Sequence, residues 1–143
     1  MTTICATLSE MAADSKCVDE DLHFTDLGKI RRIGATIVGV AGDADLCDAF
    51  FAWAADNKKP TEALRKKGAE WVALVLSPGG LFMFKGATLL PMKFERGWHA
   101  IGSGALGALV AMDLGKSPRE AIEVTAKHEN NTGVPVVVLK LKK

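Results

Sequence analysis

The chain has 143 residues, of which 48% are apolar and 24% charged, and its formal net charge is +1. This length suits one domain with a single core, so we expect residues 1–143 to form one domain. A net charge near zero gives no electrostatic reason to expect nucleic acid or a membrane as a partner, and the apolar runs are too short to cross a bilayer. The N-terminus has no pattern of a secretory signal, which predicts a cytoplasmic protein.

The metal-ligating side chains are scattered along the chain. The three cysteines (Cys5, Cys17, Cys47) and three histidines (His23, His99, His128) match no zinc spacing. We therefore expect free thiols in a reducing compartment, no metal and no cofactor.

The first elements are predicted to form a short hairpin. Residues 3–8 favour a strand and residues 11–13 its returning arm, with a turn near Ser9-Glu10. This hairpin would bring Asp14 back beside the N-terminus. Residues 15–28 are acidic and irregular, and we expect a surface loop there.

The next segment is predicted to be strand, strand, helix. Residues 29–33 alternate like an exposed strand, and residues 36–41 are apolar enough for a buried one. After Gly42-Asp43, apolar side chains recur at helical spacing and define one face of a helix (Leu46, Ala49, Phe50, Trp53, Ala54). Residues 57–60 should end this helix.

The second half continues with a hairpin, two helices and a last strand. Residues 61–68 suggest one or two helical turns, and 71–76 and 81–84 a strand pair around a turn at 77–80. Residues 89–95 suggest a further, less regular strand, and 98–101 another short one. A helix opens at Gly102-Ser103-Gly104 and ends at Gly115. Ser117, Pro118 and Glu120 then form a strong helix start, for a helix to about His128. Residues 134–141 form the final strand, and the whole order predicts an α+β fold of layered sheets and helices.

The start of the chain suggests a nucleophile. Removal of Met1 would leave Thr2 with a hydroxyl and a free α-amine, and such an amine is a base near neutral pH. A threonine whose own amine takes the hydroxyl proton is a known activated nucleophile. A frayed terminus is the alternative interpretation.

Gly102-Ser103-Gly104-Ala105-Leu106-Gly107 reads as G-x-G-x-x-G between a strand and a helix. In a dinucleotide-binding fold such a motif cradles a pyrophosphate, but too few elements follow it here. Tight packing of the helix start is the interpretation we favour, with Ser103 available to bond a neighbour.

Two further features are open to more than one interpretation. Gly42, at the end of a buried strand, could direct a backbone N–H toward an oxyanion, or it could form a simple turn. Lys29 could favour ionisation of a nearby hydroxyl while Asp14 holds it in place. It could equally belong to a solvated basic edge with Arg31 and Arg32.

The order of these features resembles the proteasome β-subunit family of N-terminal nucleophile (Ntn) hydrolases, and HslV-type peptidases within it. The resemblance spans nearly the whole chain, in five segments (Thr2-Thr3-Ile4, 11–14, 29–33, 39–45 and 100–104), and ends in the closing turn and strand at 132–136.

The resemblance implies a four-layer α-β-β-α sandwich and a threonine peptidase. Thr2 would be the nucleophile, Lys29 would favour its ionisation and Asp14 would hold Lys29. Gly42 N–H would bind the oxyanion, while Ser103 and Glu129 would position the α-amine. A pocket with Val40 and Ala44 would accept an apolar substrate side chain. Family members form stacked homo-oligomeric rings that degrade polypeptides, commonly supplied by an ATP-driven unfoldase.

This chain departs from the family pattern in three places. Asp14 follows Thr2 more closely, Glu129 stands where the family often has Asp, and the segment after Asn57 is too short for a full second helix. Other interpretations are a catalytically silent ring-forming scaffold, a small-molecule amidase of the same nucleophile class and, more distantly, a nucleotide-binding protein.

Overall fold

Two antiparallel sheets form the centre of the molecule in the computed structural model, which describes residues 2–19, 22–24, 28–56, 62–86 and 89–142. The first sheet has the order β10-β1-β2-β11, with strands His99–Gly102, Thr3–Ala6, Glu10–Ala13 and Val137–Lys140. The second has the order β5-β6-β7-β8-β9, with strands Ile30–Ile33, Thr36–Gly42, Trp71–Ser77, Gly80–Lys85 and Met92–Lys93. A separate pair joins β3 (Cys17–Asp19) to β4 (Leu22–Phe24).

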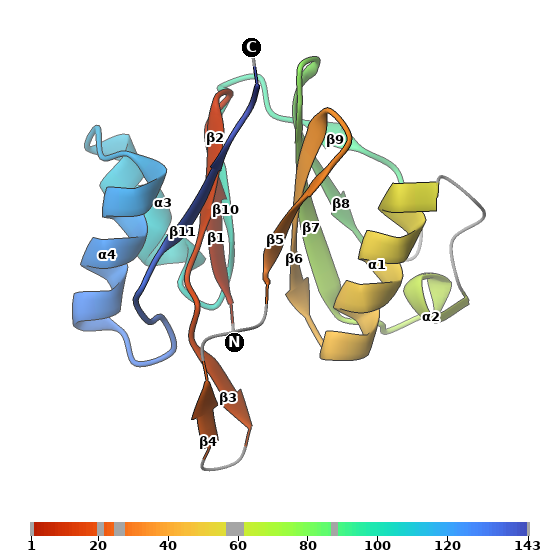
Figure 1. The fold of residues 1–143 in the computed structure, drawn as a ribbon, viewed down its shortest axis with the longest axis horizontal. Helices are drawn as coiled ribbons and strands as arrows, with labels where there is room; N and C mark the ends of the chain where they lie inside the picture. The colour runs from red at the N-terminus through yellow and green to blue at the C-terminus, as the bar shows by residue number, and fades with distance from the viewer. Residues whose placement is uncertain (1, 20–21, 25–27, 57–61, 87–88, 143) are drawn as a thin grey trace.

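Helices cover the outer faces of the two sheets (Figure 1). Helices α3 (Ala105–Asp113) and α4 (Pro118–His128) pack on β1, β2 and β10, while α1 (Ala44–Asp56) packs on β5, β6 and β7. The short α2 (Glu62–Arg65) contacts α1. The inner faces of the two sheets meet between β1 and β6 and between β10 and β7. This arrangement confirms the predicted α+β class.

Strand β6 shows why a buried strand appears in the sequence as a continuous apolar run. Successive side chains of a strand point to opposite faces. Ile37 and Ala41 therefore enter the core between the sheets, whereas Val38 and Val40 enter the core beneath α1. Both faces of the strand are buried, so apolar residues do not alternate with polar ones. Among the described residues, no helix is long and apolar enough to span a membrane.

The structure differs from the predicted local structure in three places. Residues 15–28 do not form only a loop, because β3 and β4 pair within them and project from the body (Figure 1). Their few β-favouring residues are hidden among charges, so no periodic signal stands out. The less regular strand expected at 89–95 is shorter: Met92 and Lys93 pair with β8, and Phe94 N donates to the Leu81 carbonyl at 3.0 Å. The last strand starts at Val137, not at residue 134, and Pro135 has no N–H to offer a sheet.

The predicted start of α4 is confirmed in detail. Ser117 Oγ accepts a hydrogen bond from Glu120 N at 3.2 Å, and Glu120 Oε1 accepts one from Ser117 N at 3.1 Å. These two bonds form a capping box, with Pro118 at the first helical position. The hydrogen bonds from Ser117 also hold the pKa of Glu120 below its ordinary value.

The glycines that precede α3 allow it to approach the N-terminal strand closely. A Cβ on Gly102 would lie 1.7 Å from the Thr2 carbonyl oxygen, and one on Gly104 would lie 2.3 Å from Thr3 Oγ1. Gly107 packs in the same way against Thr125. The G-x-G-x-x-G pattern is thus accounted for by packing against the chain itself, as the favoured interpretation of the sequence expected.

Replacing Gly102 with alanine tests this close approach against a matched control. Gly102 and Gly115 have similar positive φ angles, +96° and +90°, but nothing lies within 4 Å of a Cβ on Gly115. We expect Gly115→Ala to lower the free energy of unfolding by about 1–2 kcal/mol through backbone strain alone. Gly102→Ala should lower it by on the order of 4 kcal/mol, because the clash with Thr2 adds to that strain. Chemical denaturation measures both, and equal losses would contradict the packing explanation.

Candidate active site

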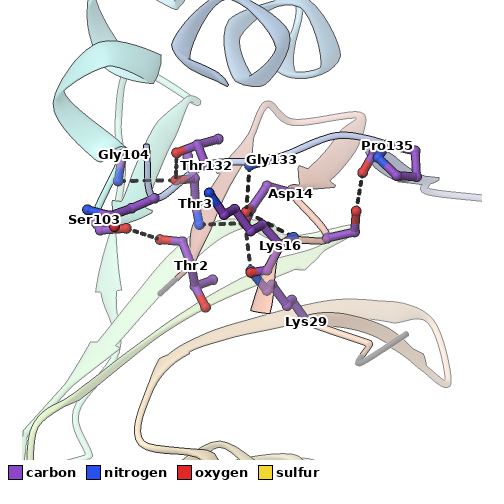
Figure 2. A network of polar contacts seen from close by, with 12 residues as sticks. Thr2, Thr3, Asp14, Lys16, Lys29, Ser103, Gly104, Thr132, Gly133 and Pro135 are labelled. Atoms are coloured by element: carbon purple, nitrogen blue, oxygen red, sulfur yellow. Dashed lines mark hydrogen bonds and ion pairs between the residues drawn. The ribbon is translucent and has the colours of Figure 1, made fainter. Parts of the chain in front are cut away.

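The buried carboxylate of Asp14 is the centre of a polar network at the end of β2 (Figure 2). Its Oδ1 accepts hydrogen bonds from Thr3 N and from Lys29 Nζ, both at 2.9 Å. Its Oδ2 accepts from Gly133 N at 3.2 Å and from Lys16 N at 3.3 Å. A carboxylate offers about four acceptor sites, so these partners compensate the loss of water around the charge.

Lys29 supplies the positive charge of the network. It immediately precedes β5, and its ammonium donates to Asp14 Oδ1 at 2.9 Å and to the Lys16 carbonyl at 2.5 Å. The Lys29 side chain is only 7% exposed and that of Asp14 is fully buried. The pair therefore differs from an exposed basic edge, which was the other interpretation of Lys29. Breaking a buried pair of this kind leaves one charge without compensation.

The peptide group between Thr2 and Thr3 is held from both sides. Its N–H, on Thr3, donates to Asp14, and its oxygen, on Thr2, accepts from Ser103 N at 2.8 Å. Ser103 Oγ donates a longer bond of 3.4 Å to the same oxygen. Because Thr3 N and Lys29 Nζ bond to the same Asp14 oxygen, their separation cannot exceed the length of those two bonds. Thr2, Asp14, Lys29 and Ser103 thus come together, as Figure 2 shows.

Glu129 joins this network one step further away. It follows α4, and its carboxylate accepts from Thr132 Oγ1 at 2.5 Å and from Asn131 N at 2.8 Å. Thr132 Oγ1 in turn lies 2.8 Å from Thr3 Oγ1. Burial opposes ionisation of Glu129, but the hydrogen bonds from Thr132 and Asn131 outweigh it and hold its pKa below the ordinary value. Through these bonds Glu129 reaches Thr3.

The other three predicted residues lie at the end of β6 and the start of α1. Val40 N donates to the Lys29 carbonyl at 3.3 Å, which puts this end of β6 beside Lys29. Gly42 closes the strand with a φ of +141°, and a Cβ there would lie 2.5 Å from the Glu70 carbonyl oxygen. Ala44 is exposed at the start of α1, whereas Val40 is buried in the core beneath that helix. Their roles in an oxyanion site and a substrate pocket stay predictions.

Four residues of the network were not singled out by the sequence. Thr3 and Thr132 supply hydroxyls, while Lys16 and Gly133 supply main-chain groups to Asp14 and Lys29. A buried carboxylate always needs several donors, but nothing in the sequence says which amides provide them. The only local signal was the Thr132-Gly133 turn before the last strand.

Other potential sites do not coincide with this network. Within the described ranges, no group of three His, Cys, Asp or Glu side chains could hold a metal ion. A surface hollow lined by Thr7, Leu8, Trp98, Met112 and Lys116 begins past the C-terminal end of β1, whereas Thr2 precedes that strand. The network is therefore the candidate active site, with a threonine main chain fixed beside a buried cation.

Comparison with known proteins gives the same architecture. No family model and no curated protein matches the sequence. The solved structure of Thiobacillus denitrificans BPH in complex with epoxomicin is 19% identical, with a TM-score of 0.74 over 99% of this chain and 100% of that one. A second structure of that BPH is 20% identical, with a TM-score of 0.75 over 98% of each chain. Eukaryotic HslV from Trypanosoma brucei is 18% identical, with a TM-score of 0.72 over 99% of each chain. The chain therefore has the fold of the HslV and BPH structures over nearly its whole length.

Proposed function

We propose that this chain is a threonine peptidase of the proteasome and HslV type, active after removal of Met1. Residues 1–143 would then form one Ntn hydrolase domain, a four-layer α-β-β-α sandwich with a reduced second helix. The observation that carries this proposal is the buried Asp14–Lys29 pair, because Asp14 also binds the amide that follows Thr2.

Each group would have a distinct role in the reaction. Thr2 supplies the nucleophilic hydroxyl, and its own α-amine is the general base. The Lys29 ammonium stabilises the ionised hydroxyl, while Asp14 keeps Lys29 in place. Ser103 holds the Thr2 carbonyl, and Glu129 supports the same segment through Thr132 and Thr3. Gly42 N–H stabilises the oxyanion, and Val40 and Ala44 belong to the substrate pocket.

The reaction then proceeds in two halves. The α-amine takes the hydroxyl proton as Oγ1 of Thr2 bonds to the substrate carbonyl carbon, and the C=O π electrons move onto oxygen. Collapse of this oxyanion breaks the C–N bond, and the leaving amine takes the proton from the ammonium. Water, deprotonated by the same amine, attacks the Thr2 ester. The resulting oxyanion collapses with cleavage of the bond between the carbonyl carbon and Thr2 Oγ1. Oγ1 takes the proton back from the ammonium, which releases a carboxylic acid and restores the hydroxyl and the free amine.

The geometry supports this assignment because it restrains the residue that carries the nucleophile. The peptide group after Thr2 is bonded at its N–H and at its oxygen, so Thr2 has little freedom of position. Fixing reacting groups in place lowers the barrier by reducing the entropy lost in the reaction. The BPH structure solved with epoxomicin supports the same class and supplies a probe.

We propose further that the chain assembles into a homo-oligomeric ring that receives polypeptides, with an ATP-dependent unfoldase as a possible partner. Helix α3 and its C-cap residue carry an apolar stripe of Leu106, Val110 and Leu114, which are 77%, 54% and 77% exposed. Residues four apart lie on one face of a helix, so these three form one continuous surface. A contiguous apolar surface of this kind is typical of an interaction site.

The first test is the intact mass of protein expressed from its own start codon, before and after exposure to epoxomicin. We expect a mass that lacks Met1 and a single adduct that Thr2→Ala abolishes and Thr7→Ala leaves unchanged. An adduct without cleavage of any peptide would indicate an amidase. A mass that retains Met1, with no adduct, would rule out the mechanism and leave a silent ring protein.

Substitution of Lys29 tests the buried pair. Lys29→Met removes the partner of a fully buried carboxylate, so we expect the free energy of unfolding to fall by about 3–5 kcal/mol and adduct formation to stop. Arg31→Met is the matched control, since Arg31 pairs with the exposed Asp48 and should cost about 1 kcal/mol or less. Denaturation and labelling rates measure the two effects. Full labelling of a folded Lys29→Met protein would exclude a role for Lys29 in the reaction.

Substitution of the α3 stripe tests assembly. We expect the unaltered protein to sediment as an oligomer. The double variant Leu106→Glu/Val110→Glu should sediment with a much smaller mass, because its new carboxylates would have to be buried in the interface without a partner. Leu90→Glu alters a leucine that is 68% exposed outside the stripe and should leave the mass unchanged. A single-chain mass for the unaltered protein in analytical ultracentrifugation would contradict the ring.

A further inference from the structure

Three hydrogen bonds connect the start of α3 to Glu129 through two hydroxyl groups. Gly104 N donates to Thr3 Oγ1 at 3.1 Å, Thr3 Oγ1 lies 2.8 Å from Thr132 Oγ1, and Thr132 Oγ1 lies 2.5 Å from Glu129 Oε2. Thr3 is fully buried and Thr132 nearly so. The two hydroxyls therefore depend on one another for partners, since water cannot replace either of them.

The direction of each bond in this chain follows from the inventory of donors. The Glu129 carboxylate is ionised at neutral pH and can only accept, so Thr132 must donate its single hydroxyl hydrogen to it. Thr3 must then donate to Thr132, and its free lone pair accepts from Gly104 N–H. The Gly104 N–H and the two threonine hydroxyls thus each donate one hydrogen bond, and all three bonds point from the amide toward the carboxylate.

This chain of bonds caps helix α3 from outside the helix. The N-cap residue is Gly104, which has no side chain to accept from the first free N–H groups. Thr3, on strand β1, accepts instead from the N–H of Gly104 itself, which is also one of the N–H groups without a partner inside the helix. Because the N-terminus of a helix is its positive end, polarisation toward the Glu129 carboxylate is favourable there.

Thr3 is thus the residue where two carboxylates act on the N-terminal strand. Asp14 binds its main-chain N–H directly, as Figure 2 shows. Glu129 binds its hydroxyl through Thr132. We infer that Thr3 is a positioning residue, whose hydroxyl couples the ionisation of Glu129 to the start of α3 and so to the placement of Thr2. Ser103, beside Gly104 in that turn, holds the Thr2 carbonyl. This inference rests on the proposed function only in its effect on catalysis.

The chemistry predicts how the coupling depends on pH. The pKa of Glu129 is lower in the folded chain than in the unfolded one, so its carboxylate contributes stability at neutral pH. That contribution is lost as the pH falls through the folded pKa. A protonated Glu129 carboxyl can donate as well as accept, so it no longer fixes the direction of the hydrogen bonds between the Thr132 and Thr3 hydroxyls.

The catalytic test compares Thr3→Val with Thr3→Ser. Valine keeps the shape and the main-chain bond to Asp14 but removes the hydroxyl, whereas serine keeps the hydroxyl. We expect Thr3→Val to lower kcat by about tenfold to a hundredfold through misplacement of Thr2, with KM little changed, and Thr3→Ser to retain most of kcat. Thr7→Val, which alters a half-buried threonine at the hairpin turn outside the network, is the matched control. Unchanged kcat in folded Thr3→Val protein would overturn the assignment.

A second readout does not need an active enzyme. In the unaltered protein, the NMR shift of the Gly104 amide should follow the titration of Glu129, and Thr3→Val or Glu129→Gln should abolish that response. Exchange of the Gly104 amide with solvent should also become faster in Thr3→Val than in Thr3→Ser. A Gly104 shift that ignores the Glu129 titration would refute the coupling even if the enzyme is active. A coupled shift in a protein that forms no adduct would refute the proposed function alone.

Discussion

The buried carboxylate of Asp14 is the group on which the rest of this site depends. It accepts from four donors, which come from the N-terminal strand, the segment after β2, the segment before β5 and the turn before β11. A buried charge is tolerated only where such partners surround it. The requirement to compensate one charge therefore holds several distant segments in a single arrangement.

The same constraint explains how a short chain can restrain its second residue. Thr2 precedes β1, and the end of a chain is normally free to fray. Here the pairing of Thr3 with Gly102 brings the Gly102-Ser103-Gly104 turn against the Thr2–Thr3 peptide. The absence of Cβ atoms in that turn permits the contact, since alanine at Gly102 would overlap the Thr2 carbonyl. Backbone geometry and side-chain chemistry thus act on the same peptide group.

Local physics accounts for which predictions succeeded. The α4 start was predictable because a capping box uses residues three apart, and α1 because its apolar face recurs at helical spacing. The β3–β4 hairpin was missed because short strands with polar neighbours have no periodic signal. The pocket role of Val40 stays a prediction; the structure shows its side chain packed beneath α1, because alternation along β6 turns it to that face.

The α+β class and the order of most elements could be predicted from the sequence, because they follow from local patterns. A resemblance in chain order also grouped Thr2, Asp14, Lys29 and Ser103 as candidates. Which atoms form hydrogen bonds with these residues is known from the tertiary structure alone. Gly133, Lys16 and Thr132 become partners of Asp14, Lys29 and Thr3 through sheet register and loop packing. Such contacts join residues far apart in the chain, so no pattern of neighbours can specify them.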